Sequence, residues 1–329
     1  MLFLNAEDVR HCLPMSACIE AMKQAFLSLI ENRVQMPLRT QLSLDCHDGT
    51  TLVMPAWINE DSQPALAVKI VSVFDRNPII GHARIQAAVV VLEPQTGCLK
   101  ALIEGSSLTG IRTAAVSGAA TDLLARKDSR TVAILGSGVQ ARTHIEAMCA
   151  VRPIETVWIY SPTSAHVESL ILELTDQGAI NARLHAADSA ASAVSQADII
   201  CTTTTSAVPV FHDEDLQPGV HINAVGSYTP EAREIPSETV VRARVIVDDR
   251  HAAWTEAGDL IQPLESSLID RDHVLASLGE LVAETAIGRA KDQEITLFKS
   301  VGLAVQDAMA ARLALLQAAL QQRGQILNG

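Results

Sequence analysis

The stretch Thr131–Glu146 reads TVAILGSGVQARTHIE, and it decides the fold. Apolar residues 132–135 end at two glycines that flank one serine, and a segment with helical spacing follows at once. The pattern G-x-G-x-x-A therefore stands where it is needed, after a strand and before a helix. Its first glycine permits a tight turn, its second lets backbone N–H groups approach a pyrophosphate, and its alanine lets the helix pack closely. The expected cofactor-binding residues are Gly136, Ser137, Gly138, Val139, Gln140 and Ala141.

From residue 131 onward, short β-branched runs alternate with helical patterns. The runs span 131–135, 156–160, 197–203, 220–226 and 243–249. They lack polar/apolar alternation, as strands covered on both faces do. Residues 142–151, between the first two runs, have helical spacing. This succession predicts an α/β fold with a Rossmann-type, doubly wound parallel sheet.

The first 112 residues have a different pattern. Residues 16–33 predict a helix with Ser16 as its N-cap. Alternating segments separated by Gly, Pro and Asn turns follow, and they predict a mostly antiparallel sheet. These segments span 38–44, 50–57, 65–73, 83–92 and 98–105. The region is therefore expected to form a smaller α+β unit. Residues 303–322 predict a long helix too apolar for a single buried stripe, so it should pack on another domain or subunit.

Composition limits the possible partners. The chain has 329 residues and a net charge of −13, which disfavours nucleic acid and anionic membranes as partners. Six scattered cysteines form no CxxC pair, so neither a zinc site nor a disulfide framework is expected. No apolar run approaches the roughly 20 residues of a membrane span. The N-terminus lacks a signal-peptide pattern, and we expect a cytoplasmic protein.

The residues after the second strand bear on the choice of dinucleotide. An acid there would bond the ribose 2′-hydroxyl of NAD. The chain instead reads Tyr160, Ser161, Pro162, Thr163, and the hydroxyls of Ser161 and Thr163 are able to donate to a 2′-phosphate. The sequence favours NADPH and leaves NADH open.

Four motifs together resemble the ornithine cyclodeaminase/μ-crystallin family. They are GSGVQAR at 136–142, IRTAAVSGAA at 111–120, HINAVGS at 221–227 and FKSVGLAVQD at 298–307. The resemblance covers essentially the whole chain. It implies a dinucleotide-binding Rossmann domain at 113–302. It also implies a substrate-binding and dimerisation domain made of 1–112 and 303–329, and hence a homodimer.

The resemblance also implies a site for a substrate carboxylate, held by Arg39, Lys69 and Arg112. Three cations in an acidic protein would select an anion, and arginine binds a carboxylate through two parallel hydrogen bonds. Lys69 is conspicuous in the apolar strand LAVKIV, where an unpaired charge is costly. Each cation alone would otherwise be read as a solvated or structural ion-pair residue. Further cofactor contacts are expected from Thr113, Val225, Gly226, Ser227 and Lys299.

Two positions depart from the cyclodeaminase pattern, in which aspartate and glutamate stand where this chain has Tyr228 and Leu52. Tyrosine, with an ordinary pKa near 10, is a poor base at neutral pH. We therefore expect an NAD(P)H-dependent reductase of cyclic ketimine carboxylates, with Δ1-pyrroline-2-carboxylate or Δ1-piperideine-2-carboxylate as the small imino-acid partner. Lys69 and Tyr228 are the catalytic candidates, Tyr228 being either a proton donor or a pocket wall. Ornithine cyclodeaminase and a non-catalytic NADPH-dependent binding protein remain the alternatives.

Overall fold

The computed structural model describes residues 1–60, 63–178 and 180–327. The chain divides into two compact units, one of Met1–Arg112 with Leu303–Gly329 and the other of Thr113–Gly302. Helix α3 (Gly105–Leu124) begins in the first unit and ends in the second. In the described part of the chain, no helix is both long and apolar enough to cross a membrane.

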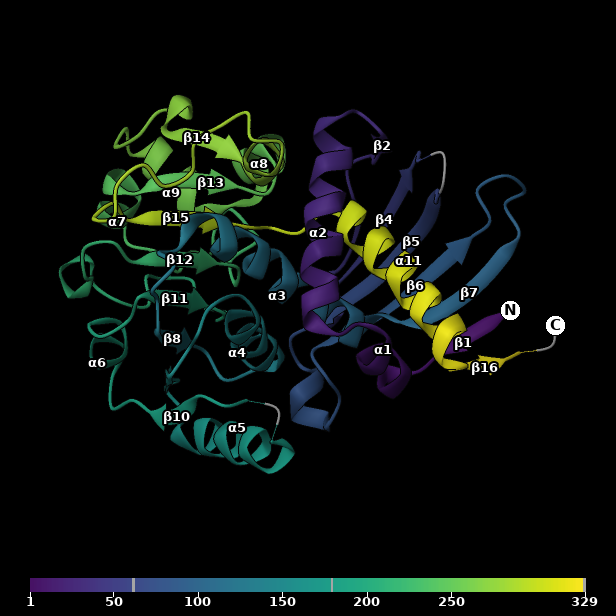
Figure 1. The fold of residues 1–329 in the computed structure, drawn as a ribbon, viewed down its shortest axis with the longest axis horizontal. Helices are drawn as coiled ribbons and strands as arrows, with labels where there is room; N and C mark the ends of the chain where they lie inside the picture. Colours follow the sequence, from purple (N-terminus) through teal and green to yellow (C-terminus); the bar gives the residue numbers. More distant parts are fainter. Residues whose placement is uncertain (61–62, 179, 328–329) are drawn as a thin grey trace. The chain divides into compact units, whose positions relative to one another are not determined.

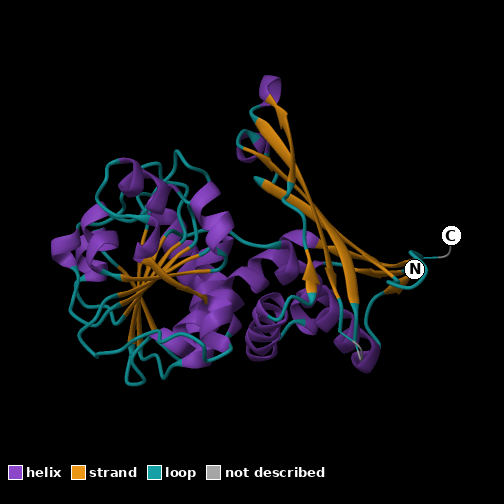
Figure 2. Cartoon of the chain, turned by 90° about the horizontal axis from the view of Figure 1, so that it is seen from above, coloured by secondary structure: helices purple, strands orange, loops and turns teal. Residues whose placement is uncertain are grey.

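The second unit is built on a parallel sheet, as predicted. Its strand order is β10-β9-β8-β11-β12-β15-β13-β14, and every neighbouring pair is parallel. The strands are β8 (Thr131–Leu135), β9 (Thr156–Tyr160), β10 (Arg183–Ala186), β11 (Ile199–Thr202), β12 (His221–Ala224), β13 (Arg244–Val247), β14 (Val274–Ser277) and β15 (Thr296–Lys299). The helices are α4 (Val139–Val151), α5 (Ser164–Gln177), α6 (Ala190–Val194), α7 (Ser237–Arg242), α8 (Arg250–Glu256), α9 (Gly258–Glu265) and α10 (Leu278–Val282). Figure 2 shows helices on both sides of this sheet, which explains why β11 and β12 are buried at every residue.

The strand order places a switch point between β8 and β11. The chain runs from β8 outward to β9 and β10, and then returns to the other side of β8 with β11 and β12. Loops that follow β8 and β11 diverge at this point, and in such sheets a ligand binds in the crevice outside the carboxyl ends of the strands. The glycine-rich residues 136–138 follow β8 and stand at this place.

The first unit contains a mixed sheet covered by helices on one face. Its order is β16-β1-β7-β6-β5-β4-β2, with β3 paired to β4. The strands are β1 (Leu2–Leu4), β2 (Val34–Gln35), β3 (Thr40–Leu44), β4 (Gly49–Ile58), β5 (Ala65–Phe74), β6 (Ile85–Leu92), β7 (Leu99–Glu104) and β16 (Gln325–Ile326). The predicted antiparallel pairing holds from β3 to β7, whereas β1 is parallel to β7. The helices are α1 (Ala6–Cys12), α2 (Met15–Ile30) and α11 (Ala304–Gln321).

Helix α11 is the predicted long helix at the end of the chain. It packs on α2 and across β4, β5 and β6, as Figure 1 shows. Its first eight residues are all buried, so one apolar stripe would not suffice. The chain thus returns from residue 302 to complete the core of its N-terminal part.

The N-cap prediction for α2 was wrong. The helix begins at Met15 with Pro14 in the cap position, and Pro14 provides no side-chain cap. Its fixed φ of −60° with extended ψ starts the helix two residues before Ser16 would. Ser16 therefore lies inside the first turn.

Candidate active site

Gly136 ends β8 in a conformation open only to glycine. Its φ is 120°, and a Cβ there would lie 2.6 Å from Thr203 Oγ1 and 2.8 Å from the Thr203 carbonyl oxygen. Its N–H donates to the carbonyl oxygen of Tyr160 at 2.8 Å. This turn brings the start of α4 beside the ends of β9 and β11.

Gly138 is the N-cap of α4, and no side chain caps the helix. A Cβ added to Gly138 would meet nothing within 4 Å, so protein packing does not require this glycine. Ala141 is fully buried where the helix passes the sheet. The uncapped N–H groups of the first turn and the open space above Gly138 fit a pyrophosphate, which also gains from the helix dipole. Around these residues, Ser137 and Gln140 are half-buried and Val139 is exposed.

Ser161 and Thr163 follow β9, next to the turn at Gly136. Ser161 is half-buried, and Thr163 is exposed at the N-cap of α5 without using its side chain as a cap. Neither hydroxyl has a hydrogen-bond partner in the described part of the chain. Both are therefore available to an adenosine ribose or its 2′-phosphate.

A histidine connects helix α3 to helix α4, the helix that follows the glycine-rich turn. His144 Nδ1 bonds to the Gln140 carbonyl oxygen at 2.7 Å, and Nε2 lies 2.9 Å from Ser117 Oγ. Burial lowers the pKa of His144 to about 4, so the imidazole is neutral at pH 7. Thr113 is half-buried one helical turn before Ser117, on the same side of α3.

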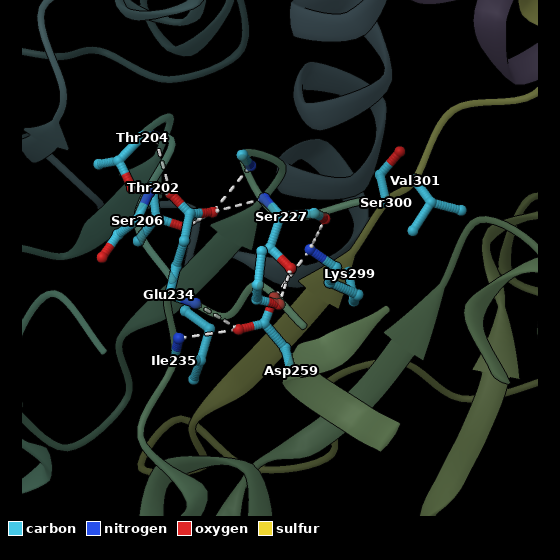
Figure 3. Close-up of polar contacts among 12 residues, drawn as sticks. Thr202, Thr204, Ser206, Ser227, Glu234, Ile235, Asp259, Lys299, Ser300 and Val301 are labelled. Atoms are coloured by element: carbon cyan, nitrogen blue, oxygen red, sulfur yellow. Dashed lines mark hydrogen bonds and ion pairs between the residues drawn. The ribbon is translucent and has the colours of Figure 1, made fainter. Parts of the chain in front are cut away.

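Two loops at the carboxyl edge of the parallel sheet are held by one buried carboxylate. We call residues 203–206 the β11 loop and residues 225–228 the β12 loop. Glu234 accepts from Thr202 Oγ1 at 2.9 Å, and from the N–H and hydroxyl of Thr204 at 2.7 Å each. It also accepts from the N–H groups of Gly226 at 2.7 Å and Ser227 at 3.3 Å (Figure 3). A Cβ on Gly226 would lie 2.5 Å from Glu234 Oε1, so this approach requires glycine.

Lys299, a predicted cofactor contact, is fully buried beneath the β12 loop. Its Nζ pairs with Asp259 Oδ2 at 2.8 Å and donates to the Ser227 carbonyl oxygen at 2.5 Å. Asp259 Oδ1 in turn accepts from the N–H groups of Glu234 and Ile235. With no exposed surface of its own, Lys299 supports the loop, and its contribution to cofactor binding stays a prediction. Val225 and Gly226 are half-buried in that loop, and Ser227 is buried.

Tyr228 ends the β12 loop and is half-buried. Its hydroxyl has no hydrogen-bond partner among the residues that the structure describes. Tyr228 lies four residues beyond the end of β12, at the carboxyl edge of the sheet, where ligands bind in folds of this kind.

In the first unit, Lys69 lies on the buried face of β5. It is 2% exposed, and its Nζ lies 2.7 Å from Asp307 Oδ2. Burial lowers the pKa of Lys69 to about 8, with help from the positive charges of Arg112 and Arg39, while Asp307 opposes the shift. An ammonium with this pKa releases its proton far more readily than an ordinary lysine.

Arg112 meets the same carboxylate from α3. Its Nε donates to Asp307 Oδ1 at 2.9 Å, and a terminal nitrogen donates to Gln306 Oε1 at 2.5 Å. Asp307 and Gln306 lie in the first turn of α11, where the helix dipole favours a negative charge. Two of the three predicted cations are therefore brought together on one buried aspartate.

Arg39, the third predicted cation, is half-buried just before β3 and lies close enough to lower the pKa of Lys69. Leu52 lies on the same face of the sheet as Lys69, because it pairs with Val71, two residues further along β5. The wall beside Lys69 is thus apolar where cyclodeaminases were expected to have a carboxylate.

The sequence did not indicate the three buried acids of these networks. Asp307 stood within the quoted motif at 298–307 but has the ordinary appearance of an acid at the start of a helix. Glu234 and Asp259 lie in polar segments without a local pattern. In the part of the chain that the structure describes, no group of three or more His, Cys, Asp or Glu residues is placed to hold a metal ion.

Comparison with known proteins places these features in a family. The model of the ornithine cyclodeaminase/mu-crystallin family matches residues 1–319. A Δ1-pyrroline-2-carboxylate reductase of Bacillus cereus is 40% identical over 313 residues, covering 95% of each chain. The structure of Thermococcus litoralis Δ1-pyrroline-2-carboxylate reductase with NADH and L-proline is 38% identical, with a TM-score of 0.95 over 99% of this chain and 100% of that one. An archaeal alanine dehydrogenase dimer with bound NAD is 29% identical, with a TM-score of 0.91 over 100% and 99%. The chain belongs to the ornithine cyclodeaminase/mu-crystallin family.

Proposed function

We propose that this protein is an NAD(P)H-dependent reductase of cyclic ketimine carboxylates, which converts Δ1-pyrroline-2-carboxylate to proline. The observation that carries the proposal is the buried cluster of Lys69, Arg112 and Asp307, with Arg39 close enough to act on Lys69. Two buried cations share one carboxylate there, and buried excess charge is costly unless an anion joins it. A substrate carboxylate supplies that anion.

The residues of the cluster have separate tasks. Asp307 and Gln306 use two N–H groups of Arg112 and fix its plane, which leaves the rest of the guanidinium for a carboxylate. Arg39 adds a second cation. Lys69, with its lowered pKa of about 8, holds the proton that the imine nitrogen gains when the C=N bond is reduced. Leu52 contributes an apolar surface on the same face for the ring.

The second unit is proposed to hold the dinucleotide, which supplies the hydride when bound. Gly138 and the uncapped start of α4 would hold the pyrophosphate, with Gly136 fixing the turn and Thr113 supporting a phosphate. Ser161 and Thr163 would face the adenosine ribose. The β12 loop would border the nicotinamide, and Tyr228 at its end is the second candidate for the proton donor.

The decisive experiment is reduction by the purified protein. Δ1-pyrroline-2-carboxylate or Δ1-piperideine-2-carboxylate is added with NADH or NADPH, and loss of the reduced-cofactor absorbance is followed together with the amino acid formed. We expect turnover with at least one of the two rings. Tight binding of cofactor and imine without oxidation would instead favour a binding protein. Ornithine consumed with release of ammonia would favour a cyclodeaminase. A cytoplasmic location agrees with the use of a reduced dinucleotide.

We also propose that the protein is a homodimer formed through the outer face of the first unit's sheet. Val53 and Ile70 pair directly on the face opposite Lys69 and are 36% and 42% exposed, and Leu42 on the same face is 63% exposed. Such an apolar patch marks an interface, and the related archaeal alanine dehydrogenase is described as a dimer. Sedimentation analysis should show a dimer that Ile70→Glu dissociates. The control Leu172→Glu, at an exposed position of α5, should leave it intact.

A further inference from the structure

Glu234 is a fully buried carboxylate that faces five hydrogen-bond donors. Oε1 accepts the N–H and hydroxyl of Thr204, and Oε2 accepts the hydroxyl of Thr202 and the N–H groups of Gly226 and Ser227. One oxygen therefore holds the β11 loop and the other mainly the β12 loop. Figure 3 shows the carboxylate between the two loops.

The backbone of Glu234 is itself anchored. Asp259 Oδ1 accepts the N–H groups of Glu234 and Ile235 at 2.6 and 2.9 Å. The other oxygen of Asp259 pairs with Lys299, whose ammonium also binds the Ser227 carbonyl oxygen. The β12 loop is thus held through Gly226 and Ser227 N–H on one side and Ser227 C=O on the other. The links through Ser227, Asp259 and Lys299 are buried, and solvent weakens them little.

The two loops follow β11 and β12, which form the second half of the doubly wound sheet. The glycine-rich turn after β8 and the hydroxyls of Ser161 and Thr163 after β9 belong to the first half, which takes the adenosine side of a dinucleotide. The nicotinamide side then falls to the second half. A residue that fixes the β11 and β12 loops should therefore affect binding of the nicotinamide side of the dinucleotide and leave binding of its adenosine side unchanged.

We propose that Glu234 is a positioning residue that sets the β11 and β12 loops for the nicotinamide half of the dinucleotide. The inference rests on the proposed function for the identity of that ligand. Glutamine in its place has nearly the same shape but replaces one acceptor oxygen by an NH2 group. Turned one way, this group opposes the N–H of Thr204. Turned the other way, it opposes the N–H groups of Gly226 and Ser227. Either orientation releases one loop.

The test compares Glu234→Gln with Asp198→Asn. Asp198 is a matched control, because it also ties backbone N–H groups of the same sheet, those of Arg130 and Thr131, but at the opposite, amino-terminal end of the strands. The dissociation constants of NADH and of ADP-ribose, which lacks nicotinamide, are measured by calorimetry. NADPH and 2′-phospho-ADP-ribose replace them if they bind more tightly to the wild-type protein.

We expect Glu234→Gln to weaken NADH binding about tenfold, the effect of roughly one to two lost hydrogen bonds. Binding of ADP-ribose should change less than about twofold, and Asp198→Asn should leave the ratio of the two constants unchanged. Thr204→Val, which removes one donor to Glu234, should shift the ratio in the same direction by a smaller factor and serves if Glu234→Gln does not fold.

Equal weakening of NADH and ADP-ribose in Glu234→Gln, or an unchanged ratio, overturns the positioning role. So does the same change of ratio in Asp198→Asn. A wild-type protein that binds neither ligand overturns the proposed function together with this role. A wild-type protein that binds both but reduces no ketimine overturns only the proposed function, because the binding ratio does not depend on turnover.

Discussion

Replacing Lys69 by methionine tests the cationic cluster most directly. Methionine keeps most of the length of the lysine stem, so the change removes one ammonium from the buried face of β5. Asp307 retains Arg112 at 2.9 Å, and the fold is spared an unpaired buried charge, which would cost about 3–5 kcal/mol. We expect the free energy of unfolding to change by less than about 2 kcal/mol.

The effect on catalysis should be much larger than the effect on stability. Loss of one charge-assisted hydrogen bond to a buried carboxylate should cost about 2–4 kcal/mol, or roughly 30- to 1000-fold in kcat/KM. If Lys69 also donates the proton, general acid catalysis adds a further factor of about 10²–10⁴. Cofactor affinity should stay nearly unchanged, because the residues expected to hold the pyrophosphate belong to the second unit and Lys69 to the first.

The pH profile separates the ammonium from the rest of the side chain. The pKa of Lys69 is lowered to about 8, so the charged form is lost as the pH rises through that value. For wild-type protein, kcat/KM for ketimine reduction should fall about tenfold per pH unit above this point. Lys69→Arg keeps the positive charge at every accessible pH, so its kcat/KM should not fall in this range. Any titration of the imine itself would appear equally in both proteins.

Steady-state reduction of Δ1-pyrroline-2-carboxylate across pH, together with thermal unfolding and cofactor titration of each variant, checks all these points. A Lys69→Met protein that folds, binds cofactor and still turns over near the wild-type rate would refute the reasoning. Lys69 would then be a structural ion-pair residue. If kcat/KM of Lys69→Arg falls with rising pH just as in the wild type, the titrating group is another one.

Three further predictions concern other parts of the chain. We expect a higher kcat/KM with NADPH than with NADH and a shift towards NADH in Ser161→Asp, because a carboxylate repels a 2′-phosphate; a clear NADH preference of the wild type would contradict this. Ornithine should be a poor substrate, since Tyr228 and Leu52 replace the expected acids, and rapid release of ammonia from ornithine with catalytic NAD would disprove it. Burial lowers the pKa of His144 to about 4 and of His221 to about 3, below the unfolded value of about 6.5. The unfolded chain therefore takes up these protons first, and the free energy of unfolding should drop by up to about 1.4 kcal/mol per pH unit for each histidine as the pH falls below 6.5. Denaturant titration at several pH values measures this, and a flat profile from pH 6.5 to 5 would count against it.

The fold was largely predictable because its signals are local. Strands β8 and β9 occur at the predicted residues, since burial on both faces leaves an unbroken β-branched run and the glycines mark where β8 stops. Shorter elements escaped prediction. Strands β1 and β16 have three and two residues, too few for any periodicity, and they exist because β7 offers a free edge to β1 and β1 in turn offers one to β16.

The candidate site was predictable only where a residue type is unusual in its local sequence. Lys69 was conspicuous because a charge interrupts an apolar strand. Glu234 and Asp259 lie in segments where an acidic residue is ordinary, and their burial depends on contacts with segments distant in sequence. Lys299 was identified by motif, but its part in holding the β12 loop depends on Asp259, 40 residues earlier, which no local pattern connects to it.

The two buried lysine–aspartate pairs differ in what surrounds them, and this difference separates a binding site from a framework. Lys299 and Asp259 have further partners within the fold: the ammonium also binds a carbonyl oxygen, and the aspartate also accepts two backbone N–H groups. The buried Glu234 carboxylate lies near enough to act on both, so this network has no excess of positive charge. Lys69 and Asp307 are joined by Arg112, so two buried cations share one buried carboxylate. A buried excess of cations is stable only if an anion completes it. The same pair of residue types therefore braces a loop in one unit and, in the other, leaves room for the carboxylate of a substrate.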